Sequence, residues 1–170
     1  MENNIKGAIA EQLTKELLFD AGYEVHYYGV EHLVPGFSNR TNGTAMDESF
    51  HTNKVIRRLP DFLVVKDGRT YYIESKFRME GGLVLAKDYP FPDAYIILFT
   101  KEELFIGLAA ELISGEKPFE SIKDYNPLGF SDEAMLETKQ LLHKYFYVTD
   151  DWKQKESQKK LNKLLDEKKG

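Results

Sequence analysis

The stretch that most constrains this chain is residues 57–78, RRLPDFLVVKDGRTYYIESKFR. Two runs rich in β-branched, aromatic and aliphatic residues, Leu59–Val65 and Thr70–Phe77, flank the dipeptide Asp67-Gly68. An Asp-Gly pair between such runs supplies the positive φ angles of a two-residue type I′ turn. The sequence therefore predicts a β-hairpin, and the turn sets the pairing of every residue in it.

The register of this hairpin brings two acids together. Counting back from the turn pairs Phe62 with Ile73 and sets Asp61 directly opposite Glu74. Directly paired residues have Cβ atoms about 5 Å apart, and like charges at that separation destabilise a sheet. Lys76 points to the same side as Glu74, because side chains alternate along a strand. We therefore expect this face to take up a cation. The opposite face is expected to consist of Phe62, Val64, Tyr71, Ile73 and Phe77.

The charged residues of the hairpin also form a motif. Pro60-Asp61 followed by Glu74-Ser75-Lys76 resembles the PD-(D/E)XK signature of the restriction-endonuclease-like superfamily. Upstream, the segments GAIAE at 7–11 and LLFDAG at 17–22 are similar to the region that carries a helical glutamate in Holliday-junction resolvases and their relatives. The resemblance covers roughly residues 5–100.

The first helix is predicted over residues 4–21, and Gly22 suits the left-handed position just past its end. Glu11 lies at the margin of the apolar face. Spacing alone favours a solvent-facing surface residue for Glu11, whereas the resemblance favours the site acid. Glu16, nearer the middle of the stripe, is the second candidate. The stripe consists of apolar residues at four-residue steps, namely Ile5, Ile9, Leu13 and Leu17.

The resemblance implies both a fold and an activity. The implied fold is α/β, with a restriction-endonuclease-like core of order α-β-β-β-α-β, a mixed central sheet and added C-terminal helices. The implied activity is that of a metal-dependent nuclease, an endonuclease that hydrolyses phosphodiester bonds, with DNA as the expected substrate. A homodimer would suit cleavage of two strands.

The resemblance also implies roles for single residues. Hard oxygen ligands suit Mg²⁺, with Mn²⁺ as the expected substitute. Lys76 is expected to orient or help activate the attacking water, with its pKa lowered by burial and raised by nearby carboxylates. The implied catalytic residues are Glu11, Asp61, Glu74 and Lys76. The implied metal ligands are Asp61, Glu74, Glu11 and the carbonyl of Ser75. The expected phosphate contacts are Arg58 and Arg78.

Between the first helix and the hairpin, the sequence predicts a strand over Tyr23–Leu33 and a long loop over residues 35–54. His26 is expected to be a structural histidine, because no partner histidine stands at a ligand spacing. The loop precedes the strand of Asp61 and could close over the site, although a plain flexible loop is the favoured interpretation. Its candidate substrate contacts are Arg40, Asp47 and His51.

Beyond the hairpin, a turn and a short helix are predicted within Met79–Tyr89, then strands over Ala94–Phe99 and Leu104–Ile113. Residues 116–130 read as a connection. Ser131 is a good helix cap, and the helix it starts is expected to run to about Tyr147. His143 is expected on its surface. The residues it is expected to bury are Met135, Leu136, Leu142 and Phe146.

With 170 residues, 42% of them hydrophobic, the chain is expected to form one globular domain over residues 1–150, followed by a Lys-rich helix over 151–170. The absence of a long apolar run or signal-like start predicts no membrane association and a cytoplasmic location. The final 20 residues hold seven lysines against four acids, a charge of +3, so residues 1–150 carry −8 and the whole chain −5.

Two other functions are compatible with the sequence. A family relative without catalysis could serve as a nucleic-acid-binding or protein-interaction module. The net charge of −5 favours such a module over a nuclease, because it counts against the broad basic surface that sequence-independent nucleic-acid binding usually needs. Alternatively, the chain is an unrelated α/β domain whose hairpin charges face solvent. DNA-cleavage assays separate the nuclease from these two alternatives.

Overall fold

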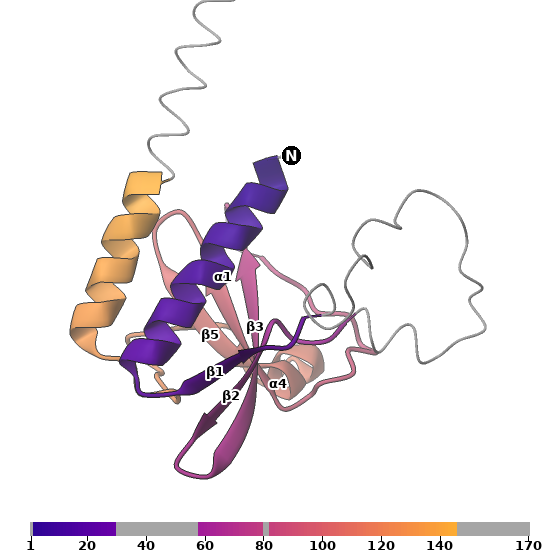
Figure 1. Ribbon diagram of the computed structural model, residues 1–170. Coiled ribbons are helices and arrows are strands. Elements are labelled where there is room, and N and C mark those ends of the chain that lie inside the picture. Colours follow the sequence, from indigo (N-terminus) through magenta and orange to yellow (C-terminus); the bar gives the residue numbers. More distant parts are fainter. Residues whose placement is uncertain (1, 30–57, 80–81, 146–170) are drawn as a thin grey trace, which may run out of the picture.

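The computed structural model describes residues 2–29, 58–79 and 82–145. The predicted loop at 35–54 and the Lys-rich segment at 151–170 lie outside these ranges. The elements, in chain order, are α1 (Glu2–Asp20), β1 (Glu24–Tyr27), β2 (Phe62–Lys66), β3 (Arg69–Phe77), β4 (Ala94–Phe99), β5 (Leu104–Leu108), α4 (Ala109–Ser114), β6 (Glu120–Ser121) and a helix over 132–145 (Figure 1).

The strands form one mixed sheet in the order β1-β2-β3-β4-β5-β6. All neighbouring pairs are antiparallel except β3 and β4, which run parallel. The mixed α/β class expected from the sequence is therefore confirmed. Among the described residues, no helix is long and apolar enough to cross a membrane.

The hairpin of β2 and β3 has the predicted turn and register. Asp67 and Gly68 have φ angles of 50° and 72°, as a type I′ turn requires. Phe62 pairs with Ile73, which is the last pair of this ladder. Asp61 directly precedes Phe62, and Glu74 directly follows Ile73, so both acids stand just beyond the last pair.

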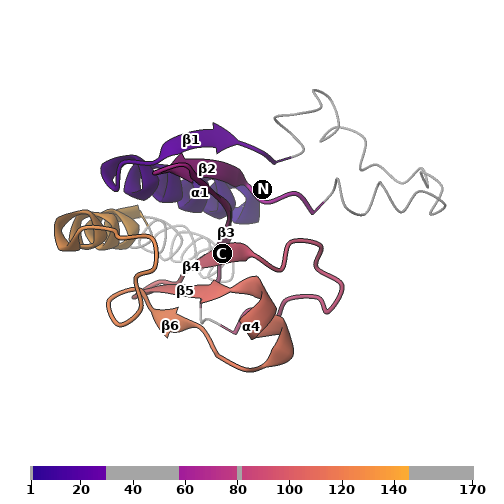
Figure 2. The ribbon, with the colours of Figure 1, turned by 90° about the horizontal axis from the view of Figure 1, so that it is seen from below.

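Helices cover both faces of the sheet. α1 and the helix over 132–145 lie side by side on one face, while α4 lies on the other (Figures 1 and 2). The face under α1 buries Phe62, Val64 and Ile73 as predicted, together with Ile97 and Phe99. The face under α4 carries a second apolar cluster around Ala94, Ile96 and Ala109.

The buried face of α1 differs from the predicted stripe. Leu13 and Leu17 are buried, but Ile5 is 57% exposed. A row of strict four-residue steps drifts around a helix of 3.6 residues per turn, so it cannot stay on one face. The residues of α1 that are buried against the sheet are Ala10, Leu13, Thr14, Leu17 and Leu18.

The C-terminal end of α1 and the start of the helix over 132–145 follow their local signals. Gly22 has a φ of 81°, and the N–H of Tyr23 donates to the Leu18 carbonyl, which closes the helix end. Ser131 caps the helix over 132–145, because its Oγ accepts a hydrogen bond from the N–H of Ala134 at 3.1 Å.

Two predicted elements beyond the hairpin are wrong. Residues 82–89 hold no helix: Val84 is 89% exposed between the partly buried Leu83 and Leu85, which is the two-residue alternation of an extended chain. The predicted strand over Leu104–Ile113 ends at Leu108, and α4 replaces its second half. The α-β-β-β-α-β order therefore lacks its crossover helix between β3 and β4.

Smaller corrections concern bounds and burial. The strand predicted over Tyr23–Leu33 is limited to β1 within the described residues, and the connection at 116–130 contains the short β6. In the helix over 132–145, Met135 and Leu142 are buried as predicted, but Leu136 is 58% exposed. Phe146 lies outside the described residues.

Candidate active site

The candidate site lies where β2 and β3 stop pairing. The Asp61 carbonyl accepts a hydrogen bond from the N–H of Tyr28 at 2.8 Å, which fixes Asp61 to the end of β1. Its side chain turns to β3, where Oδ2 accepts from the N–H of Ser75 at 2.7 Å. The Asp61 carboxylate thus accepts the backbone hydrogen bond of the residue that follows Glu74.

Glu74 carries a largely buried carboxylate. Its side chain is 10% exposed and forms an ion pair through Oε1 with the ammonium group of Lys76. The other oxygen, Oε2, is buried without a hydrogen-bond partner among the described residues. Such an orphaned acceptor costs stability unless a ligand or solvent group reaches it.

Burial raises the pKa of Glu74 above its ordinary value, and the charge of Glu11 raises it further. Lys76 and the Asp61 backbone oppose this rise. For Lys76, burial alone would lower the pKa, but the carboxylates of Glu74, Asp61 and Glu11 outweigh it, so the pKa is raised. Lys76 is therefore a cation at neutral pH, and three acids act on it at once.

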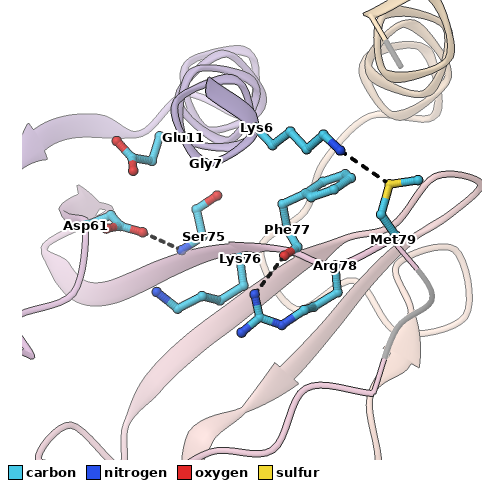
Figure 3. Close-up of a pocket in the computed structure, with 9 residues that line it drawn as sticks. All are labelled: Lys6, Gly7, Glu11, Asp61, Ser75, Lys76, Phe77, Arg78 and Met79. Carbon is cyan, nitrogen blue, oxygen red and sulfur yellow. Dashed lines mark hydrogen bonds between the residues drawn. The ribbon is translucent and has the colours of Figure 1, made fainter. Parts of the chain in front are cut away.

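A cavity of about 420 Å³ opens beside these residues. Figure 3 shows Glu11 reaching down from α1 toward Asp61, while Lys76 approaches from β3. Gly7, Glu11 and the buried Thr14 lie along one row of α1, and the Thr14 hydroxyl lies 3.0 Å from the Ser75 hydroxyl. The cavity is lined by Lys6, Gly7, Glu11, Asp61, Ser75, Lys76, Phe77, Arg78 and Met79.

The far end of the cavity is cationic and apolar. Lys6 extends from α1 over the Phe77 ring, with Nζ 5.7 Å from the ring centroid and 3.8 Å from the Met79 sulfur. The exposed Arg78 donates to the Phe77 carbonyl at 3.1 Å. One cavity thus has acids at one end and two cations at the other. Lys6 was not singled out in the sequence, where it is one lysine among many.

Other residues considered in the sequence lie elsewhere. Glu16 is exposed and accepts a hydrogen bond from Gln12 at 2.9 Å, so its predicted place within the apolar stripe is wrong. Arg58 forms an ion pair with the Asp88 carboxylate at 2.8 Å and does not line the cavity. His26 is an exposed residue paired with Glu24.

One residue near the acids was missed altogether. The hydroxyl of Tyr89 is buried without a hydrogen-bond partner among the described residues. Burial, followed by the charges of Glu74 and Asp61, raises the pKa of Tyr89 well above its ordinary value. No sequence signal separates this tyrosine from the nine others in the chain.

The chemistry of the donors fits a hard divalent cation, because carboxylate oxygens are the ligands that Mg²⁺ prefers and Glu74 Oε2 has no hydrogen-bond partner among the described residues. The arrangement is not that of a closed metal cage. Within residues 2–29, 58–79 and 82–145, no three acidic or histidine side chains converge as a metal-binding group. Lys76 occupies the other carboxylate oxygen of Glu74, Oε1, in an ion pair.

Comparison of the chain with protein-family models, with curated proteins and with solved structures finds no match in any of the three. The resemblance to the PD-(D/E)XK superfamily therefore stays a prediction.

Proposed function

We propose that this chain is a divalent-metal-dependent nuclease that hydrolyses phosphodiester bonds in DNA. The observation that carries the proposal is the placing of Asp61 next to Glu74, because the Asp61 carboxylate accepts from the N–H of Ser75 and Glu74 pairs with Lys76. Glu11 from α1 lines the adjoining cavity together with Asp61 and Lys76. Acids from three separate elements around one partly buried lysine are costly for stability alone, so a functional role explains them better.

Each residue has a role in the proposed reaction. Asp61, Glu74 and Glu11 would hold Mg²⁺, and the bound ion would supply charge neutralisation at the scissile phosphate and a more acidic water. The positive charge of Lys76 lets it hydrogen-bond to the attacking water or to the developing charge on phosphate. Because its pKa is raised, it acts as a donor of hydrogen bonds and not as the base.

The cationic end of the cavity suits the DNA backbone. Arg78 and Lys6 line this end, and the Phe77 ring lies between their side chains (Figure 3). Guanidinium and ammonium groups bind phosphate oxygens, whereas an aromatic ring can contact a base or sugar. DNA contact there would place its backbone across the cavity, from the two cations toward the acids.

Cleavage of plasmid, single-stranded and branched DNA with Mg²⁺, Mn²⁺ or EDTA tests the proposal. The wild type should cleave at least one substrate with metal and none with EDTA. Asp61→Asn and Glu74→Gln should lose the activity, while the exposed controls Asp124→Asn and Glu137→Gln keep it. Glu11→Gln should lose most activity and Glu16→Gln none. An intact set of substrates with the wild type would exclude catalysis.

A non-catalytic module of the same fold is the second candidate function. The ion pair that closes Lys76 onto Glu74 favours it, because a structural pair needs no metal. Titration with Mn²⁺ separates a metal site from solvent-facing charges: binding by the folded wild type that is lost in Asp61→Asn, without cleavage, would support an inactive relative that retains its site.

A further inference from the structure

Tyr89 lies in the irregular crossover between β3 and β4. Its N–H donates to the Ala86 carbonyl at 3.0 Å, which closes a turn. Its ring packs edge-on to the Phe91 ring, with the two ring centroids 6.2 Å apart. The ring contacts the apolar cluster around Ile96. Since Ile96 is the register partner of Glu74 on β4, Tyr89 covers the face of the sheet from which Glu74 projects.

A second contact ties this turn to the acids. Arg58 precedes Asp61 by three residues, and its guanidinium group binds both the carboxylate of Asp88 at 2.8 Å and the Asp88 carbonyl at 3.1 Å. Asp88 is the neighbour of Tyr89 in the chain. The bridge therefore holds the Tyr89 turn against the segment that delivers Asp61.

Two buried polar side-chain atoms among the described residues lack a hydrogen-bond partner, and they are Glu74 Oε2 and the Tyr89 hydroxyl. Leaving one such group unpaired costs about 1–3 kcal/mol. Tyr89 packs on the cluster around Ile96, and Ile96 is the register partner of Glu74, so the two groups lie on the same face of the sheet. Their coincidence on one face of the sheet points to a common polar ligand that reaches both.

We propose that Tyr89 is a positioning residue of the site, whose hydroxyl accepts a hydrogen bond from a water in the hydration shell of a divalent cation at Glu74. The inference rests on the proposed metal-dependent function. Mg²⁺ keeps several of its waters when proteins bind it, and groups around such waters orient them and tune affinity. Tyr89 reaches the cation through water and touches neither the cation nor DNA.

Tyr89→Phe tests this role, because it removes the hydroxyl and keeps the ring. In EDTA, the midpoint of thermal unfolding should stay unchanged or rise, since the lost hydroxyl has no hydrogen-bond partner in the part of the chain that the structure describes. In Mn²⁺, calorimetric titration should show an affinity reduced by roughly tenfold. The metal-induced rise in midpoint should shrink as well. Tyr71→Phe, the same change on the other face of β3, should bind Mn²⁺ like the wild type.

The outcomes separate this inference from the proposed function. If the wild type binds Mn²⁺ and cleaves DNA, but Tyr89→Phe binds the metal equally well, the role of Tyr89 is wrong and the nuclease stands. If Tyr89→Phe is destabilised in EDTA with unchanged affinity, the hydroxyl holds a structural water instead. A wild type that binds no metal overturns both proposals.

Discussion

Lys76 shows how burial and charge act against each other on a single group. Burial favours the neutral amine, whereas the carboxylates of Glu74, Asp61 and Glu11 favour the ammonium form and prevail. The same lysine reduces the cost of burying Glu74, whose pKa remains raised. An ammonium group held this way is a built-in cation, and a metal ion must compete with it for Glu74.

We predict that Lys76→Met binds Mn²⁺ several-fold more tightly than the wild type and loses DNA cleavage. The substitution removes the competitor from Glu74 and the repulsion between two cations, but it also removes the donor to water or phosphate. Isothermal titration calorimetry and the plasmid assay measure the two effects. Lys139→Met is the control, because Lys139 pairs with Glu103 away from the cavity. Weaker metal binding by Lys76→Met would show that the lysine supports the ion.

Single elements bring these residues into reach of one another. The two-residue turn sets the register of β2 against β3, and a slip of one residue would move Glu74 and Lys76 to the face under α1. Packing of α1 on β3 through Thr14 and Ser75 then sets the height at which Glu11 enters the cavity. The site therefore depends on a turn and on one helix contact.

We predict opposite effects of Gly→Ala substitution at two sites of the fold. Gly68→Ala should lower the free energy of unfolding by about 1 kcal/mol, because Gly68 has a φ of 72° that an L side chain rarely adopts. Gly7→Ala should raise it by about 0.5–1 kcal/mol, since Gly7 is within α1 and an added Cβ meets nothing within 4 Å. Urea unfolding in EDTA measures both, and equal signs would contradict the turn geometry.

Across the whole chain, the sheet separates two environments. The larger cluster, under α1 and the helix over 132–145, contains most of the buried apolar side chains, and the half-buried Tyr95 packs against it beside Tyr71. The smaller cluster, under α4, stands beside Glu74 and Tyr89. Substitutions in the larger cluster should alter stability without changing metal binding, so they can serve as controls for the metal-binding experiments.

We predict that the ionisation of Tyr95 lowers the free energy of unfolding at alkaline pH. Burial, followed by interactions with Tyr125, raises the pKa of Tyr95 from 10.0 to about 12. Between these values the folded chain keeps a proton that the unfolded chain has lost, so the free energy of unfolding falls as pH rises through this window. Tyr95→Phe should make the fall less steep in a series of thermal melts. The exposed Tyr145→Phe is the control, and parallel curves for wild type and Tyr95→Phe would contradict the shift.

Local signals in the sequence predicted much of this fold correctly. The Asp67-Gly68 turn, the Gly22 helix end and the Ser131 cap each depend on the backbone preferences of a few adjacent residues, and all three occur in the structure. The register that pairs Phe62 with Ile73, the residues next to Asp61 and Glu74, follows from the turn. The sequence by itself therefore determined the hairpin and the order of acids along it.

Tertiary packing decided the rest, because it depends on contacts between residues far apart in the chain. The exposure of Glu16 and the place of Glu11 in the cavity both follow from the orientation of α1 on β3. The bond of Arg58 to Asp88 joins segments 30 residues apart. The extended course of residues 82–85 reflects burial of Leu83 and Leu85 against the sheet, which overrides local helix preference. The place of Tyr89 has the same origin, because it packs on the cluster around Ile96, and Ile96 stands next to Glu74 only once β3 and β4 are paired.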